Sequence, residues 1–144
     1  MDPREFMLTA EELLAKNGRE ADCRSAVSRA YYATYQMLRV EVLTLDRRLL
    51  SSASLAAGKM VPHQRLIDYL KGCDDAKVRA IGVNLDSLKD ARHDADYDLH
   101  LRINAKIAEQ EFEKAKLLQQ DITSIGPRNV VRALETYLRK TFGQ

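Results

Sequence analysis

The chain has 144 residues, a length that suits one domain with a single hydrophobic core. Hydrophobic residues make up 45% of it and charged residues 31%, and a net charge of only +2 excludes a strongly basic field over the whole molecule. Two cysteines, Cys23 and Cys73, are too few for a disulfide framework, and no apolar run approaches the roughly 18 residues of a membrane span. The N-terminus does not resemble a signal peptide. We therefore expect a cytoplasmic protein with reduced, buried cysteines.

Apolar residues recur at helical spacing along the chain, and the alternation typical of strands is absent. Pro3 predicts the start of a first helix, and Asn17-Gly18 predicts its end. A longer second helix follows without proline or glycine inside it. The predicted helices cover about residues 3–17, 20–43, 62–72, 75–99, 104–125 and 128–142.

The connections between these helices are also visible in the sequence. Residues 44–61 are irregular and contain several serines, which predicts a long connection. Asn104 is a predicted N-cap, and Gly126-Pro127 predicts one helix end followed by one helix start. The predicted fold class is an all-α bundle of five or six helices. Residues 1–126 are expected to form the bundle, with an amphipathic helix in 127–144 packed on the same domain.

The second predicted helix carries residues able to pack on two of its sides. Arg29 shares one side with Ser25 and Tyr32, and Tyr31 lies opposite. Such a helix is usually central to its bundle. Two interpretations of Tyr31, Tyr32 and the nearby Tyr35 stay open: core aromatics with hydroxyls at the core edge, or a rim that hydrogen-bonds a nucleotide or RNA base.

Arg92 lies within an apolar stripe of the fourth predicted helix. At about 100° per residue, four apolar residues fall within roughly 60° of its direction. A guanidinium cannot shed its charge, so a core-facing arginine needs a partner or a ligand. Asp96, four residues on, could be an internal partner that only fixes helix register; the alternative is a functional anion site. The stripe consists of Leu85, Leu88, Ala95 and Leu99.

Other chemistry is weakly represented. His63, beside a proline, is typical of a cap or loop, and His93 and His100 point well away from Arg92, as surface histidines do. There is no glycine-rich phosphate loop and no metal-ligand spacing, so no cofactor and no metal are expected. The last helix is either a solvated amphipathic face or a surface for RNA or a partner. Its basic residues are Arg128, Arg132, Arg139 and Lys140.

Two segments carry a family resemblance. Residues 23–33 read Cys-Arg-Ser-Ala-Val-Ser-Arg-Ala-Tyr-Tyr-Ala, and residues 91–97 read Ala-Arg-His-Asp-Ala-Asp-Tyr. In this order they resemble the Arg-Ser-x-x-x-Arg-x-Tyr-Tyr-Ala and Arg-x-x-Ala-Asp-Tyr elements of small prokaryotic HEPN domains, which are nucleotide-binding helical domains. His63 matches a histidine that is common between the two elements. The resemblance spans about Phe6 to Phe112.

The resemblance implies an all-α, HEPN-like bundle that dimerises, and often a minimal nucleotidyltransferase as its partner in a toxin–antitoxin pair. Active HEPN proteins are metal-independent ribonucleases with an arginine followed four to six residues later by a histidine. Carried over by position, Arg92 would stabilise charge developing on a phosphate, and Asp96 would orient it. Tyr97 stands where many members have the histidine. This tyrosine could donate a hydrogen bond or receive a nucleotide from a partner transferase.

Two hypotheses follow from the resemblance. In the first, the protein is a toxin-like ribonuclease acting through Arg92, Asp96 and Tyr97. In the second, it is a non-catalytic helical dimer that binds a nucleotide, an RNA or the transferase. In the first, Arg29 and Arg92 would line a composite cleft, and in the second, binding would depend on the same two arginines. A third alternative is a purely structural scaffold with neither activity. The other predicted nucleotide- or RNA-binding residues are Ser25, Tyr32, His63 and His93.

Overall fold

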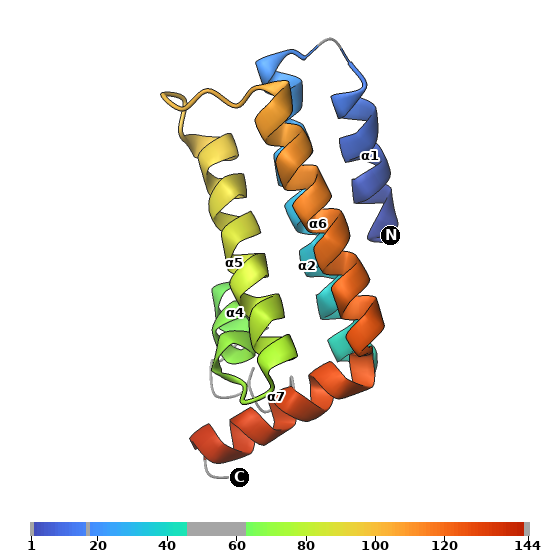
Figure 1. Cartoon of the computed structure of the whole chain (residues 1–144), viewed down its shortest axis with the longest axis vertical. Helices are drawn as coiled ribbons and strands as arrows, with labels where there is room; N and C mark the ends of the chain where they lie inside the picture. Colours follow the sequence, from blue (N-terminus) through green and yellow to red (C-terminus); the bar gives the residue numbers. More distant parts are fainter. Residues whose placement is uncertain (1, 17, 46–62, 143–144) are drawn as a thin grey trace. The chain divides into compact units, whose positions relative to one another are not determined.

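The computed structural model describes residues 2–16, 18–45 and 63–142. Over these ranges every regular element is a helix, so the predicted all-α class is confirmed (Figure 1). No helix within the same ranges is long and apolar enough to cross a membrane. The helices are α1 (Arg4–Leu14), α2 (Glu20–Leu45), α4 (His63–Gly72), α5 (Ala76–Tyr97), α6 (Ala105–Ile125) and α7 (Pro127–Phe142).

Several helix boundaries follow from local sequence signals. Pro3 directly precedes α1, as a fixed φ near −65° allows. The side-chain oxygen of Asn104 accepts the backbone N–H of Ile107 at 2.9 Å, so the predicted N-cap of α6 is confirmed. Gly126 adopts a φ of 91°, which ends α6, and Pro127 begins α7. The predicted connection at 44–61 lies outside the described residues from position 46 onward.

The predicted end of the fourth helix was wrong. We expected α5 to reach Leu99, but it ends at Tyr97. Leu99 therefore leaves the apolar stripe of Arg92, and its side chain is 82% exposed. Leu85, Leu88 and Ala95, which lie inside the helix, are buried as predicted.

The chain divides into two compact units. Unit 1 comprises Met1–Met37 and Ser87–Gln120, and unit 2 comprises Leu38–Asp86 and Asp121–Gln144. Helices α2, α5 and α6 contribute residues to both units. The predicted division at residue 126 stays a prediction.

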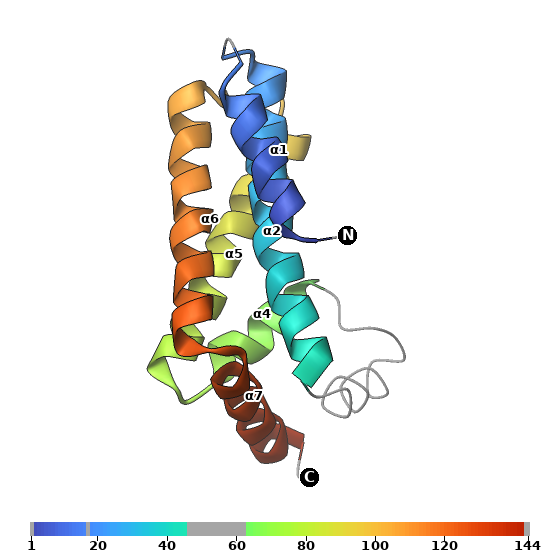
Figure 2. The ribbon, with the colours of Figure 1, turned by 90° about the vertical axis from the view of Figure 1, so that its right-hand side faces the viewer.

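Unit 1 contains α1, the first part of α2, the last part of α5 and most of α6. In both ribbon views α1 runs alongside α2 (Figures 1 and 2). A cluster of buried small and aliphatic side chains joins these helices, and Leu14 of α1 packs against it. The predicted burial of Cys23 is confirmed, and its thiol is free. The cluster consists of Cys23, Val27, Ala95, Ile103 and Ala108.

Unit 2 is held together by α4 packed against α5 and α7. The rings of Tyr69 and Tyr137 lie 5.8 Å apart, joining α4 to α7. Gly82 of α5 lies so close to α4 that an added Cβ would be 2.7 Å from the backbone nitrogen of Lys71. Cys73, the second free cysteine, is buried in this unit as predicted.

Candidate functional site

The guanidinium of Arg92 lies against two tyrosine rings. Its central carbon is 5.4 Å from the ring centroid of Tyr31 and 5.4 Å from that of Tyr32, both on α2. Only 15% of the Arg92 side chain is exposed. The electron-rich ring faces attract the cation and partly replace the water that burial removes. The arginine is therefore held where α2 and α5 meet in unit 1.

Asp96 is the carboxylate partner of Arg92. An Asp96 carboxylate oxygen lies 3.6 Å from Nη1 of Arg92, and it accepts the hydroxyl of Ser28 at 3.3 Å. The predicted i+4 pairing is thus present, but it leaves Arg92 incompletely satisfied. The Nε of Arg92 is buried and has no hydrogen-bond partner among the described residues. An arginine kept only for register would be expected to use its full set of donors.

Arg29 has a different environment from the one we predicted. The sequence suggested a packed face around it, but Arg29 and Ser25 are exposed, although Ala33 on the same side of α2 is buried. The Arg29 guanidinium carbon lies 5.8 Å from the ring centroid of Phe6 on α1. That ring is 6.4 Å from Tyr32. The two arginines are therefore linked through the rings of Phe6 and Tyr32. The predicted cleft lined by both arginines stays a prediction.

The three tyrosines of α2 divide between the two interpretations. Tyr31 and Tyr35 are buried, with rings 6.1 Å apart in a stacked arrangement, so they are core aromatics. Tyr32 is half-buried and meets Tyr31 edge-on at 5.4 Å. Of the three, Tyr32 alone has a ring placed between the core and the surface.

Arg24 is the first arginine of the Arg-Ser-x-x-x-Arg element, but the sequence pattern assigned it no role. Its side chain is 12% exposed, and its Nη1 donates to the carbonyl oxygens of Asp94, Ala95 and Asp98 at 3.0–3.2 Å. Its Nη2 donates to the carbonyl of Leu101. The carbonyls of Ala95, Asp98 and Leu101 lie at the end of α5 and in the following turn, where helix carbonyls lack intrahelical partners. The Asp94 carbonyl also accepts the backbone N–H of Asp98 at 2.9 Å. Arg24 thus caps the C-terminus of the helix that carries Arg92.

Glu20 completes this cap. Its carboxylate accepts from Nη2 of Arg24 at 2.9 Å and from the backbone N–H of Ile103 at 3.4 Å. These two interactions, the Arg24 hydrogen bond first, lower the pKa of Glu20. Two features of the sequence could have indicated the role of Arg24. Glu20 stands four residues before it and can pair with it, and Val27, three residues after it, belongs to the buried face of α2.

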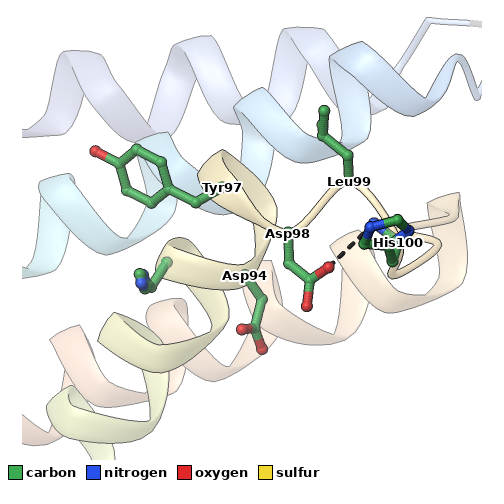
Figure 3. Close-up of a pocket in the computed structure, with 6 residues that line it drawn as sticks. Asp94, Tyr97, Asp98, Leu99 and His100 are labelled. Atoms are coloured by element: carbon green, nitrogen blue, oxygen red, sulfur yellow. Dashed lines mark hydrogen bonds between the residues drawn. The ribbon is translucent and has the colours of Figure 1, made fainter.

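The residues at the C-terminal end of α5 line a shallow pocket of about 410 Å³. Tyr97 is 68% exposed, and its ring meets that of His93 edge-on at 5.0 Å. Figure 3 shows Tyr97 and Leu99 leaving the helix end on a different side from the carboxylates of Asp94 and Asp98. Arg92 does not line this pocket. The lining residues are His93, Asp94, Tyr97, Asp98, Leu99 and His100.

The structure thus groups the predicted residues in three ways. Arg92, Asp96 and Tyr32 form a partly buried cluster, which we call the Arg92 centre and which also includes Ser28 and Tyr31. His93 and Tyr97 belong to the α5-end pocket. His63 is the first residue of α4 and belongs to unit 2. The remaining two predicted residues, Ser25 and Arg29, lie exposed on α2, outside these three groups.

No group of histidine, cysteine or acidic residues in the described ranges could hold a metal ion. Comparisons with family models, with curated proteins and with solved structures found no match for this chain.

Proposed function

We propose that the protein is a HEPN-type helical module that binds RNA at the Arg92 centre. It would act in the cytoplasm as a homodimer and as the partner of a minimal nucleotidyltransferase in a toxin–antitoxin-type system. The observation that carries the proposal is a nearly buried arginine whose Nε has no partner among the described residues and whose cation rests on two tyrosine rings. The two motifs that resemble HEPN elements support it.

An RNA phosphate is the ligand class that fits this centre. A guanidinium binds phosphate oxygens through its planar donor edge and keeps its charge at every physiological pH. Asp96 would hold the guanidinium in one orientation, as it does now at 3.6 Å. Tyr32, at the edge of the core, would stack on or hydrogen-bond the adjoining nucleotide.

Fluorescence anisotropy with a labelled single-stranded RNA, in EDTA, tests this proposal. Arg92→Met keeps a long side chain between the tyrosines but removes the charge. Arg19→Met removes the same charge from an exposed position of unit 1. We expect Arg92→Met to weaken binding by roughly ten-fold or more, the scale of a lost charged hydrogen bond, and Arg19→Met to have little effect. Equal affinities of the wild type and Arg92→Met would refute the assignment.

Metal-independent RNA cleavage is the second candidate function. His93 and His100 line one pocket together with Tyr97, at the end of the helix that carries Arg92. In such cleavage the RNA 2′-hydroxyl attacks the adjacent phosphate, and a histidine transfers protons. However, no histidine contact of Arg92 is present among the described residues. RNA incubated with the protein in EDTA should be cleaved by the wild type and not by His93→Gln or Arg92→Met. Intact RNA with the wild type would leave binding as the function.

The proposed partners have their own tests. Sedimentation of the purified chain should give twice the monomer mass of 16.4 kDa if the homodimer exists. A nucleotidyltransferase partner would transfer the AMP group of ATP to the hydroxyl oxygen of Tyr97, an exposed residue, breaking the bond between the α- and β-phosphates and releasing pyrophosphate. Mass spectrometry after incubation with that partner and ATP should therefore detect the adduct in the wild type and not in Tyr97→Phe.

A further inference from the structure

An aromatic surface beside the Arg92 centre is formed by α1 and α2. The Phe6 ring on α1 and the Tyr32 ring on α2 have centroids 6.4 Å apart and planes inclined by 33°. Arg29 covers Phe6, with its guanidinium carbon 5.8 Å from the ring centroid. Figure 2 shows α1 and α2 running side by side, the arrangement that brings the three side chains together. We call Phe6, Arg29 and Tyr32 the aromatic platform.

The aromatic platform is accessible to solvent, whereas the two neighbouring tyrosine rings of α2 are not. Phe6 and Tyr32 are half-buried and Arg29 is exposed, whereas Tyr31 and Tyr35 are fully covered. Rings kept only for the core would be covered in the same way. A guanidinium and a nucleobase are both planar and stack on the same ring face, so the position of Arg29 over Phe6 marks a place where a base can stack.

Arg29 has donors available for a phosphate. It forms no ion pair or hydrogen bond with any described residue, and its guanidinium carbon lies 5.8 Å from the centroid of the Phe6 ring. Its N–H groups are therefore available to bind the phosphate attached to a stacked base.

The platform is continuous with the Arg92 centre through Tyr32. The Tyr32 ring lies 6.4 Å from Phe6 on one side and 5.4 Å from the Arg92 guanidinium carbon on another. A base placed on Phe6 would therefore lie beside Arg29 and be separated from Arg92 by the Tyr32 ring. A duplex cannot use this site, because its bases are stacked and paired inside the helix.

We propose that the aromatic platform stacks one unpaired nucleobase of a single-stranded RNA, with Phe6 as the stacking ring and Arg29 binding the attached phosphate. This inference rests on the proposed RNA binding and names Phe6, which neither motif contains, as a ligand-contacting residue. Arg29 would move from the ring face to the phosphate when the base enters.

An RNA carrying one 2-aminopurine tests the platform, because stacking on a ring quenches the fluorescence of this base. The chain contains no tryptophan that would add to the emission. Phe6→Leu removes the ring and keeps an apolar side chain, whereas Phe6→Tyr keeps the ring. Phe112→Leu makes the same change at another half-buried phenylalanine of unit 1. Thermal melting of each variant verifies that it is folded.

We expect Phe6→Leu to lose the quenching and to weaken binding by roughly five-fold or more, the scale of one base–aromatic stack. Phe6→Tyr and Phe112→Leu should retain both signals. If Phe6→Leu does not fold, Arg29→Gln tests the platform in its place, because a substitution at this exposed position should leave the protein folded. It should weaken binding several-fold, and Arg19→Gln should not.

The two proposals fail in different ways. If the wild type binds no RNA, both are overturned. If the wild type binds RNA in an Arg92-dependent way but Phe6→Leu and Arg29→Gln keep full quenching and affinity, the platform is refuted and the proposed function stands.

Discussion

The burial of Arg92 costs desolvation free energy, and the groups around its charge compensate this cost only in part. Two ring faces and one carboxylate at 3.6 Å offset part of the desolvation, and the buried Nε has no partner among the described residues. Hydrophobic residues of similar size often replace such buried ions with little loss of stability or with a gain. Asp96 is 30% exposed, so water can solvate it without the arginine. The stability of the fold therefore does not explain why a cation stands at position 92, whereas the binding of an anionic ligand would explain it.

Cys73 gives a pH-dependent stability that can be measured. Burial, followed by the nearby Asp75 and Asp74, raises the pKa of its thiol from 9.0 to about 11. The unfolded chain therefore loses this proton at a lower pH than the folded chain. The thiol's contribution is fully present below pH 9 and is lost as the pH rises to about 11.

Urea unfolding of the wild type and of Cys73→Ala at several pH values measures this effect. Lysine and tyrosine titrations are shared by both proteins and cancel in the difference. We expect the stability of the wild type relative to the variant to fall by on the order of 2 kcal/mol between about pH 8 and 11. A difference that stays constant with pH would show that the thiol titrates normally in the folded protein.

Individual residues differ in how well the sequence predicts them. The Asp96 partner of Arg92 was predictable, because i,i+4 neighbours on a helix are close. The burial of Leu85 and Leu88 followed from periodicity. The exposure of Arg29 was not predictable. Periodicity shows on which side of α2 the residue lies, but it does not show whether another helix covers that side.

At the scale of elements, the end of α5 depends on a side chain from another helix. Arg24 satisfies four carbonyls in this region. Lysine has three donors and no planar fork, so it cannot replace arginine here. We expect Arg24→Lys to lower the free energy of unfolding by about 2–4 kcal/mol, the range for several hydrogen bonds to a buried charge.

Hydrogen exchange checks the local part of this prediction. In Arg24→Lys the amide of Asp98, which bonds to the Asp94 carbonyl at 2.9 Å, should exchange faster, and the amides around Leu85 should change little. The low pKa of Glu20 depends first on Arg24 and second on the backbone N–H of Ile103. The wild type therefore has a stabilising contribution above the ordinary pKa of this carboxyl that fades as the pH falls, and the variant should lose part of it. Unchanged exchange at Asp98 would mean that Arg24 is not the cap.

The close approach of α5 to α4 in unit 2 requires a glycine. A Cβ at position 82 would lie 2.7 Å from the Lys71 nitrogen and 2.8 Å from the Leu70 Cβ. Alanine favours a helix by about 1 kcal/mol over glycine, but the clash should outweigh it, so we expect Gly82→Ala to destabilise by about 1–3 kcal/mol. Asn84→Ala, at an exposed position of α5, should be neutral or slightly stabilising. A higher melting temperature for Gly82→Ala would contradict this packing.

Helix starts and stops were predictable where local chemistry sets them, as at Asn104 and at Gly126-Pro127. The end of α5 was not, because no glycine or proline marks it. The Asp98 side chain forms the turn there by accepting the backbone N–H groups of His100 and Leu101 at 3.0 and 3.3 Å. Arg24, about seventy residues earlier, binds the carbonyls at this helix end. Hydrogen bonds of this kind leave no periodic signal, which is why Arg24 was missed.

At the scale of the molecule, the small net charge of +2 limits how RNA can be bound. If only Arg29 and Arg92 neutralise phosphates, the slope of log K against log salt should be about −1.4 for a single strand, at about 0.7 per contact. Anisotropy titrations at several salt concentrations measure this slope. A slope near about −4 would instead indicate a wide basic surface. The exposed arginines of α7 would then be the first candidates: Arg128, Arg132 and Arg139.

Urea unfolding of the wild type and of Arg92→Met, each with and without single-stranded RNA, tests most directly whether Arg92 is kept for an anionic ligand. Without RNA, we expect the two free energies of unfolding to agree within about 1 kcal/mol. With RNA at about one hundred times its dissociation constant, the wild type should gain about 2.7 kcal/mol and the variant much less. A variant that is strongly destabilised without RNA, or an equal gain in both proteins, would contradict the assignment and make Arg92 a structural residue.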